Sequence, residues 1–271
     1  MSIIHKLDQR AKEANSLLCV GLDSNINRLP ERFLIQEHPQ FKFNKWIIEQ
    51  THQYVCAYKP NLAFYEARGE AGWKELAMTT KYLHQNHPDI FLIADAKRGD
   101  IGSTNEGYVT AIFDELGFDA VTLSPYLGQE ALEPFLKRKD KACIILCRTS
   151  NPGAGEFQDL MVDGDSLWLH VAKKVAADWN KNDNCMLVVG ATYPQELEQV
   201  RQAVGKMWLL VPGIGAQGGD LEPVLKVGLN KQGRGLVINS SRGIIFKDEP
   251  GKEAKNLNGK IQLVVTKGNY A

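Results

Sequence analysis

Eight short apolar runs recur along the chain, and each is followed by a longer segment. This alternation limits the possible folds more than any other feature. The runs have the length and composition of buried strands and cover residues 17–22, 55–59, 91–94, 120–123, 142–147, 186–189, 208–211 and 235–238. Amphipathic segments lie between them, including 73–85, 105–116, 129–137, 166–180 and 194–204. A repeated strand–helix order is typical of a parallel sheet.

Eight such units in 271 residues favour an α/β fold of the (β/α)₈ TIM barrel type, which usually takes about 250 residues. A doubly wound open sheet is the structural alternative. No linker rich in Pro, Gly or Ser divides the chain, so we expect a single domain over residues 1–271. The segment 249–271 is uncertain, because it contains Asn258-Gly259 and shows no convincing amphipathic pattern. At another helix start, Ser103-Thr104-Asn105-Glu106 predicts a capping box with Ser103 as the N-cap.

Composition excludes several classes of function. Lys+Arg and Asp+Glu both number 32, whereas a nucleic-acid-binding protein needs a basic surplus. No apolar run reaches the roughly 18 residues that span a membrane, and the N-terminus lacks the apolar core of a signal peptide. Five cysteines, an odd number, are scattered through the chain at positions 19, 56, 143, 147 and 185. We therefore expect a cytoplasmic protein with buried free thiols and no metal site.

The highest local density of charge is Asp95-Ala96-Lys97-Arg98-Gly99-Asp100, which directly follows an apolar strand. Charges at the end of a core strand are costly to bury unless they are paired. The array is therefore either a structural ion network or a working site. In a strand, Asp95 and Lys97 point to the same face. Asp100 lies beyond the strand, where a loop could aim it at the same place or at a neighbouring molecule.

Polar residues also follow five other predicted strands. They include Asp23, Lys59, the segment 148–153, the segment 212–219 and the segment 239–243. Taken singly, Asp23 can be a turn acid and Lys59 a strand-end lysine that reaches solvent. In a barrel, however, the carboxyl ends of the strands meet around one active site. That convergence favours function over a set of unrelated structural roles, and a lysine occupies the place that a metal cation would take.

The last two of these segments predict a phosphate site. Barrels of this class often bind phosphate through the loops after strands seven and eight. Glycines at 213, 215, 218 and 219 allow close backbone approach, Gln217 offers an amide, and Arg242 offers a two-pronged guanidinium. A tight turn and a surface ion pair are the structural alternatives. The glycines also match G-x-G-x-x-G, but the next strand ends in Asn239 rather than the acid that binds a dinucleotide ribose.

These motifs resemble those of the orotidine 5′-phosphate decarboxylase family, in particular its longer bacterial subgroup (type 2). The family signature, Asp-x-Lys-x-x-Asp at the end of the third strand, is matched by Asp95 to Asp100. Ser124-Pro125-Tyr126 and the segment 149–153, Thr-Ser-Asn-Pro-Gly, resemble that subgroup as well. The similarity runs from the first strand to the eighth and is not clear beyond about Asp248.

The resemblance implies a cofactor-free carboxy-lyase that converts orotidine 5′-phosphate to UMP and CO₂ in de novo pyrimidine biosynthesis. It also implies a homodimer with shared active sites. The implied roles are Lys97 as the proton donor to C6, Asp95 facing the substrate carboxylate, Asp100 and Thr104 reaching the partner's site, Lys59 and Asp23 on the ribose, Ser150 on the pyrimidine, Pro212 near the base, Gln217 and Arg242 on the phosphate, and Gly215, Gly218 and Gly219 in a closing loop.

Two other interpretations remain open. The six-residue signature is shared with sugar-phosphate relatives such as hexulose-phosphate synthases, which use Mg²⁺. A different class is a non-catalytic barrel that binds a phosphorylated nucleotide as a sensor. A sensor needs no proton donor, so the complete Asp/Lys array favours an enzyme.

Overall fold

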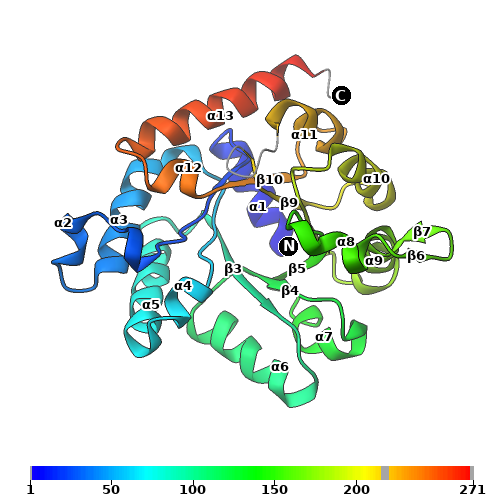
Figure 1. The fold of residues 1–271 in the computed structure, drawn as a ribbon, viewed down its shortest axis with the longest axis horizontal. Coiled ribbons are helices and arrows are strands. Elements are labelled where there is room, and N and C mark those ends of the chain that lie inside the picture. The colour runs from blue at the N-terminus through cyan, green and yellow to red at the C-terminus, as the bar shows by residue number, and fades with distance from the viewer. Residues whose placement is uncertain (1, 215–219, 269–271) are drawn as a thin grey trace.

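The structure is a computed structural model that describes residues 2–214 and 220–268. Its centre is a closed barrel of parallel strands, in which the order around the barrel follows the order along the chain (Figure 1). The barrel strands are β1 (Leu18–Val20), β2 (Ala57–Tyr58), β3 (Phe91–Arg98), β4 (Ala120–Leu123), β5 (Ala142–Arg148), β8 (Cys185–Val189), β9 (Leu209–Pro212) and β10 (Leu236–Ser240). Each overlaps one of the eight predicted runs, so the (β/α)₈ barrel is confirmed and the open sheet is excluded.

Helices surround the barrel (Figure 1). They are α1 (Ile3–Glu13), α2 (Glu31–Leu34), α3 (Pro39–Thr51), α4 (Ala63–Glu66), α5 (Gly69–Asn86), α6 (Gly102–Val109), α7 (Gly128–Leu136), α8 (Gly155–Gln158), α9 (Leu167–Lys174), α10 (Pro194–Val204), α11 (Leu221–Gly228), α12 (Arg242–Ile245) and α13 (Pro250–Lys267). Helices α6 and α9 continue as π-helical turns, Thr110–Glu115 and Val175–Trp179. A small hairpin of β6 (Met161–Val162) and β7 (Asp165–Ser166) projects from the β5–β8 connection.

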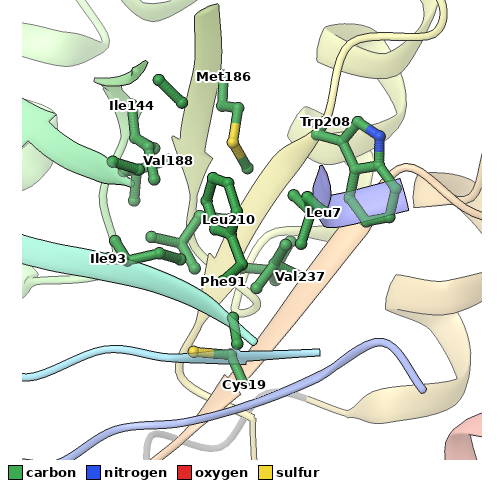
Figure 2. Close-up of a cluster of buried hydrophobic side chains, with 14 of the residues drawn as sticks. Leu7, Cys19, Phe91, Ile93, Ile144, Met186, Val188, Trp208, Leu210 and Val237 are labelled. Atoms are coloured by element: carbon green, nitrogen blue, oxygen red, sulfur yellow. The ribbon is translucent and has the colours of Figure 1, made fainter. Parts of the chain in front are cut away.

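Apolar side chains from the strands fill the inside of the barrel (Figure 2). The buried cluster includes Cys19, Phe91, Ile93, Ile144, Met186, Val188, Leu210 and Val237. Leu7 of α1 is fully buried and joins the same cluster. The barrel is therefore a packed core rather than a pore.

Helix α1 closes the end of the barrel at which the strands begin. Arg10 donates to the carbonyl of Val55, just before β2. Lys6 forms a 2.8 Å ion pair with Asp119, which directly precedes β4. These contacts fix α1 over the end of the barrel at which the strands begin. The opposite end, where the strands finish, is therefore the one available for a site.

The predicted capping box is wrong. Helix α6 begins at Gly102, its N-cap is Ile101, and Ser103 lies inside the helix without a capping hydrogen bond. Asn105 instead anchors the segment before the helix, because its Oδ1 accepts the backbone N–H of Asp100 at 3.1 Å. The side-chain amide of Asn105 also donates to the carbonyl of Ala131 in α7. The helix therefore starts two residues before the position that the local pattern indicates.

The C-terminal segment, which the sequence pattern left open, forms the long helix α13. The helix packs against α3, α11 and β1, and among its residues Pro250, Ala254 and Ile261 are buried. Asn258 and Gly259 are poor helix formers, but tertiary packing of a narrow apolar stripe outweighs that preference. The barrel therefore has a closing helix over 250–267.

All five cysteines are buried free thiols, as expected. Burial raises the pKa of Cys56, Cys147 and Cys185 to about 12, so these thiols are inert at neutral pH. Within residues 2–214 and 220–268, no helix combines the length and the apolar character that crossing a membrane requires.

Candidate active site

A cavity of about 500 Å³ opens where the barrel strands end. Seven of the predicted site residues line it: Asp23, Lys59, Asp95, Lys97, Ser150, Pro212 and Arg242. They come from the ends of six different strands, as the barrel geometry requires. Asp100 and Thr104 do not line the cavity of their own chain. Gly215, Gln217, Gly218 and Gly219 lie outside the described residues.

Asp95 is the centre of the polar network in this cavity. Its Oδ2 accepts a hydrogen bond from Nζ of Lys59 at 2.8 Å, and its Oδ1 accepts one from Nζ of Lys97 at 2.6 Å. The side chain of Lys59 is 4% exposed and that of Asp95 is 13% exposed, whereas Lys97 is 51% exposed. Lys59 is therefore buried against the Asp95 carboxylate, whereas Lys97 faces the open cavity.

The charges of the buried pair are stabilised by each other. Burial alone lowers the pKa of Lys59, but the Asp95 and Asp23 carboxylates outweigh it and raise that pKa well above its usual value. Burial alone raises the pKa of Asp95, but Lys59 and Lys97 outweigh it and hold that pKa far below its usual value. Both groups are thus charged at neutral pH.

Lys97 has an unusual backbone conformation. Its φ is 49°, in the left-handed region that residues with a side chain rarely adopt. The pairing of β3 with β4 shifts register between Ala94 and Arg98. The Oγ1 of Thr122 in β4 accepts the backbone N–H groups of both Ala96 and Lys97 at 2.9 Å. The same hydroxyl lies 3.1 Å from Oδ1 of Asp95, to which it donates.

Sequence reasoning missed Thr122. It is the only polar residue in the apolar run 120–123 and is almost fully buried. A buried hydroxyl in a core strand needs a partner, and that was the available signal. The signal shows that Thr122 must bond to something, but not that it supports the array on β3.

Asp23 occupies the side of the cavity next to Lys59. Its Oδ1 accepts the backbone N–H of Asn61 at 3.2 Å, and Asn61 in turn forms an isolated parallel bridge with Asp95. The ends of β1, β2 and β3 are therefore tied together by their own site residues. This arrangement presents two carboxylates and two amines along one wall.

Arg242 stands at the other part of the rim, as the first residue of α12. It is exposed, and no carboxylate in the described part of the chain forms an ion pair with it. Gly21 lets the neighbouring strand end approach closely, because a Cβ there would lie 2.7 Å from Cβ of Ser241. Because no carboxylate of the described residues pairs with it, the Arg242 guanidinium is available for an anion in the cavity.

Asn239 belongs to the predicted polar segment 239–243, but sequence reasoning gave it no role of its own. It lines the cavity at the end of β10, it is 8% exposed, and its Oδ1 has no hydrogen-bond partner within the described ranges. A buried acceptor without a partner is costly unless water or a ligand donates to it.

The loop after β5 forms the remaining wall. Gln158 of α8 accepts the backbone N–H of Thr149 and donates to its hydroxyl, both at 2.9 Å. Ser150 follows directly and lines the cavity. Gln158 thus fixes the start of a loop that faces the array across the cavity, and nothing in the local sequence indicated this contact.

Asp100 follows the end of β3, and Thr104 lies in α6. Oδ1 of Asp100 accepts the backbone N–H of Ile101 at 2.8 Å, and Thr104 is exposed. Arg98 pairs with Glu66 and lies over the Tyr108 ring, with Cζ 5.1 Å from its centroid. Arg98 is therefore a structural residue, whereas Asp100 and Thr104 do not line the cavity of their own chain.

In the parts of the chain that the structure describes, no group of three or more His, Cys, Asp or Glu side chains is arranged to hold a metal ion. Lys59 and Lys97 flank Asp95 on both carboxylate oxygens. The cavity can therefore hold an anionic ligand between the Lys97 ammonium and the Arg242 guanidinium.

Comparisons with known proteins agree with this fold and point to one family. Residues 16–257 match the model of the orotidine 5′-phosphate decarboxylase / HUMPS family. A relative from Herpetosiphon aurantiacus named orotidine 5′-phosphate decarboxylase is 50% identical, over 90% of this chain and 89% of its own. One of the same name from Christiangramia forsetii is 46% identical, over 96% and 94%. The structure of Leishmania donovani OMP decarboxylase superposes with a TM-score of 0.89 at 41% identity, covering 98% of this chain and all of that one. The chain therefore belongs to the orotidine 5′-phosphate decarboxylase / HUMPS family.

Proposed function

We propose that this protein is an orotidine 5′-phosphate decarboxylase that forms UMP and CO₂ without a cofactor, in the biosynthesis of pyrimidines. The observation that carries the proposal is the doubly paired Asp95, which holds Lys97 at the mouth of a cavity that also contains Arg242. The matching family model, the names of the relatives and the chemistry of the cavity support the same activity.

The reaction breaks the bond between C6 and the substrate carboxylate. The electron pair stays on C6, CO₂ leaves, and Lys97 delivers a proton to C6. The neutral lysine then takes a proton from solvent. No adjacent carbonyl delocalises the C6 charge, so stabilisation must come from fixed positive charge placed where negative charge develops. Lys97 supplies that charge because Asp95 and the Thr122-held backbone fix its position.

Substrate binding divides between the two parts of the cavity. Arg242, together with Gln217, would hold the phosphate, and Asp23 and Lys59 would hold the ribose. Ser150 would contact the pyrimidine, and Pro212 would lie near the base. The phosphate is remote from C6, so its binding energy can be used to close the site and to stabilise the transition state. Glycines 215, 218 and 219 would belong to the closing loop.

We further propose that the working unit is a homodimer with shared sites. Asp100 and Thr104 are polar residues of the signature region that do not line their own cavity. Large apolar side chains are exposed around the same rim, at Ile101, Tyr126 and Phe157. A partner that covers this rim would bury them and would bring Asp100 and Thr104 to the other chain's substrate.

A cytoplasmic location fits the proposal. Five buried free thiols with no disulfide are typical of proteins that live in a reducing compartment. Pyrimidine nucleotides and their precursors are phosphorylated metabolites, and an enzyme that acts on them works where they are made.

The alternative within the family is a hexulose-phosphate synthase, which uses Mg²⁺. The two functions are separated by incubating the purified protein with orotidine 5′-phosphate in excess chelator and following the loss of orotate absorbance. We expect full turnover and UMP as the product. No turnover with orotidine 5′-phosphate, with or without Mg²⁺, would refute the proposed activity. Turnover that disappears with the chelator would refute cofactor independence. Tight binding of UMP without any turnover would instead support the sensor.

A further inference from the structure

A second cavity of about 410 Å³ lies outside the barrel, beside α12. Figure 1 shows α12 next to the α2–α3 region, and the residues around this cavity come from those elements and from the segment that follows α12. Its charged lining residues are Arg28, Arg32, Lys247 and Asp248. Three cations face one acid in a chain whose total charge is zero, so the cavity is a local concentration of positive charge.

Both arginines rest on aromatic rings. The Cζ of Arg28 lies 4.3 Å from the ring centroid of Phe246, and the Cζ of Arg32 lies 4.6 Å from that of Trp46. No carboxylate within the described ranges forms an ion pair with Arg28, Arg32 or Lys247. A guanidinium that stacks by its face keeps its N–H groups free at the edge. These edges are suited to a phosphate, which they bind in a forked geometry.

The rings themselves are anchored in the core. Phe246 stacks on Phe43, with centroids 5.7 Å apart and an interplanar angle of 19°, and Phe43 is fully buried. Trp46 also packs against Phe43, at 6.0 Å. The two guanidinium groups are therefore positioned by a rigid aromatic cluster and do not extend freely into solvent. Arg28 and Arg32 lie over Phe246 and Trp46, so these ring faces are not open to a stacking nucleobase.

We propose that this cavity binds the phosphate chain of a small molecule that carries two or three linked phosphates. Three cations match such a chain better than a single phosphate, and the covered rings make binding independent of any base. The site is separate from the main cavity, since their lining residues do not overlap. The four-residue helix α12 nevertheless joins them, because it begins at Arg242 and ends at Ile245. The proposal goes beyond the decarboxylase activity and does not depend on it.

The test is calorimetric titration of the full-length protein with sodium tripolyphosphate at physiological salt. We expect saturable binding that survives in Arg242→Ala, where phosphate binding in the main cavity is weakened. The double variant Arg28→Gln/Arg32→Gln should bind roughly tenfold more weakly or worse. Each substitution removes charge-assisted hydrogen bonds to the phosphates, and the loss of one such bond lowers affinity by about tenfold or more. The matched control is Lys206→Gln/Lys252→Gln, which removes two positive charges at exposed sites elsewhere.

Base independence is tested in the Arg242→Ala background. ATP and UTP should bind with similar affinity and AMP much more weakly. The variant Arg28→Lys/Arg32→Lys keeps the charges but loses the fork, so its affinity should fall between those of the parent and the Gln double variant. This comparison stays informative if the Gln variant is poorly folded. The proposal is overturned if tripolyphosphate does not bind to the parent. It is also overturned if the control variant loses as much affinity as the Gln double variant, or if the Gln and Lys double variants keep the parent affinity.

Discussion

Lys97 and Asp95 form a 2.6 Å ion pair within a single strand, although Lys97 has a left-handed backbone. A regular strand would place the two side chains parallel, about 7 Å apart at their Cα atoms. The left-handed turn at Lys97 and the register shift beside it bring the ammonium back onto the carboxylate. A residue with a side chain pays roughly 1–3 kcal/mol for such a conformation, so it persists only because neighbours fix it. Thr122 does so by accepting two backbone N–H groups.

Thr122→Val should therefore lower kcat while the fold is retained. The substitution keeps the shape of the side chain but removes the acceptor of two buried N–H groups and the donor to Asp95. We expect roughly a tenfold or larger fall in kcat, because a misplacement of about 1 Å costs up to about a hundredfold. Thr122→Ser keeps the hydroxyl and should restore most of the rate. Equal kcat in Thr122→Val and the parent would show that the hydroxyl does not position Lys97.

Asp95→Asn should destabilise the fold in a pH-dependent way. The substitution leaves Lys59 buried with only Asp23 as a nearby countercharge, and loss of one partner of a buried pair costs on the order of 3 kcal/mol. The pKa of Asp95 is depressed in the folded state. Its contribution to the free energy of unfolding is therefore present above about pH 4, the pKa of Asp in the unfolded chain, and is lost as pH falls further. The pKa of Lys59 is raised in the folded state. Its contribution to the free energy of unfolding is therefore present below about pH 10 and is lost as pH rises through the folded-state pKa.

Urea unfolding of parent and Asp95→Asn from pH 3 to pH 9 checks this prediction. The difference in unfolding free energy should be greatest between about pH 5 and pH 9 and should shrink toward pH 3. A matched control is Asp114→Asn, which removes an exposed carboxylate that pairs with Arg138 and should change little. A difference for Asp95→Asn that stays constant down to pH 3 would contradict the role of the ionised pair.

Arg242→Ala should weaken ligands that carry a phosphate and spare those that do not. The guanidinium has no ion-pair partner among the described residues and lines the main cavity, so its loss should lower UMP affinity roughly tenfold to a hundredfold. Uridine lacks the phosphate and should bind both proteins equally. Calorimetric titration with the two ligands makes the comparison. Equal losses for UMP and uridine would place Arg242 elsewhere than on the phosphate.

Mixed dimers should regain activity from two inactive chains. Asp100→Ala and Lys97→Ala each disable every site in a homodimer, but a hybrid contains one site in which both residues are intact. Co-expression with two different tags isolates the hybrid, and its rate per dimer should approach half that of the parent. A purified hybrid that stays inactive would contradict shared sites.

The barrel could be predicted from the sequence because its strands are strong, short apolar runs that the helices separate at regular intervals. The polar ends of those strands were equally visible, and residues such as Asp23, Lys59 and Arg242 do lie around one cavity. Both predictions rest on local composition and on the way in which a closed parallel barrel aligns its strand ends.

The contacts that cross between elements could not be predicted in this way. Thr122 and Gln158 act through hydrogen bonds to residues on neighbouring strands and loops, and Asn105 ties the start of α6 to α7 where a capping box was expected. Helix α13 forms against its local propensity because it packs on α3 and α11. Each case depends on tertiary packing, which overrides local preference without leaving a pattern in the segment itself.

The central claim is that Lys97 protonates C6, and the most direct measurement is the decarboxylation rate of Lys97→Ala in the chelator-containing assay. The matched control is Lys137→Ala, which removes a lysine of the same 51% side-chain exposure that pairs with Glu106 on the outer helices. We predict that Lys97→Ala loses turnover while it keeps its fold and its affinity for UMP, and that Lys137→Ala keeps the parent rate. Near-parental turnover in Lys97→Ala would contradict the account.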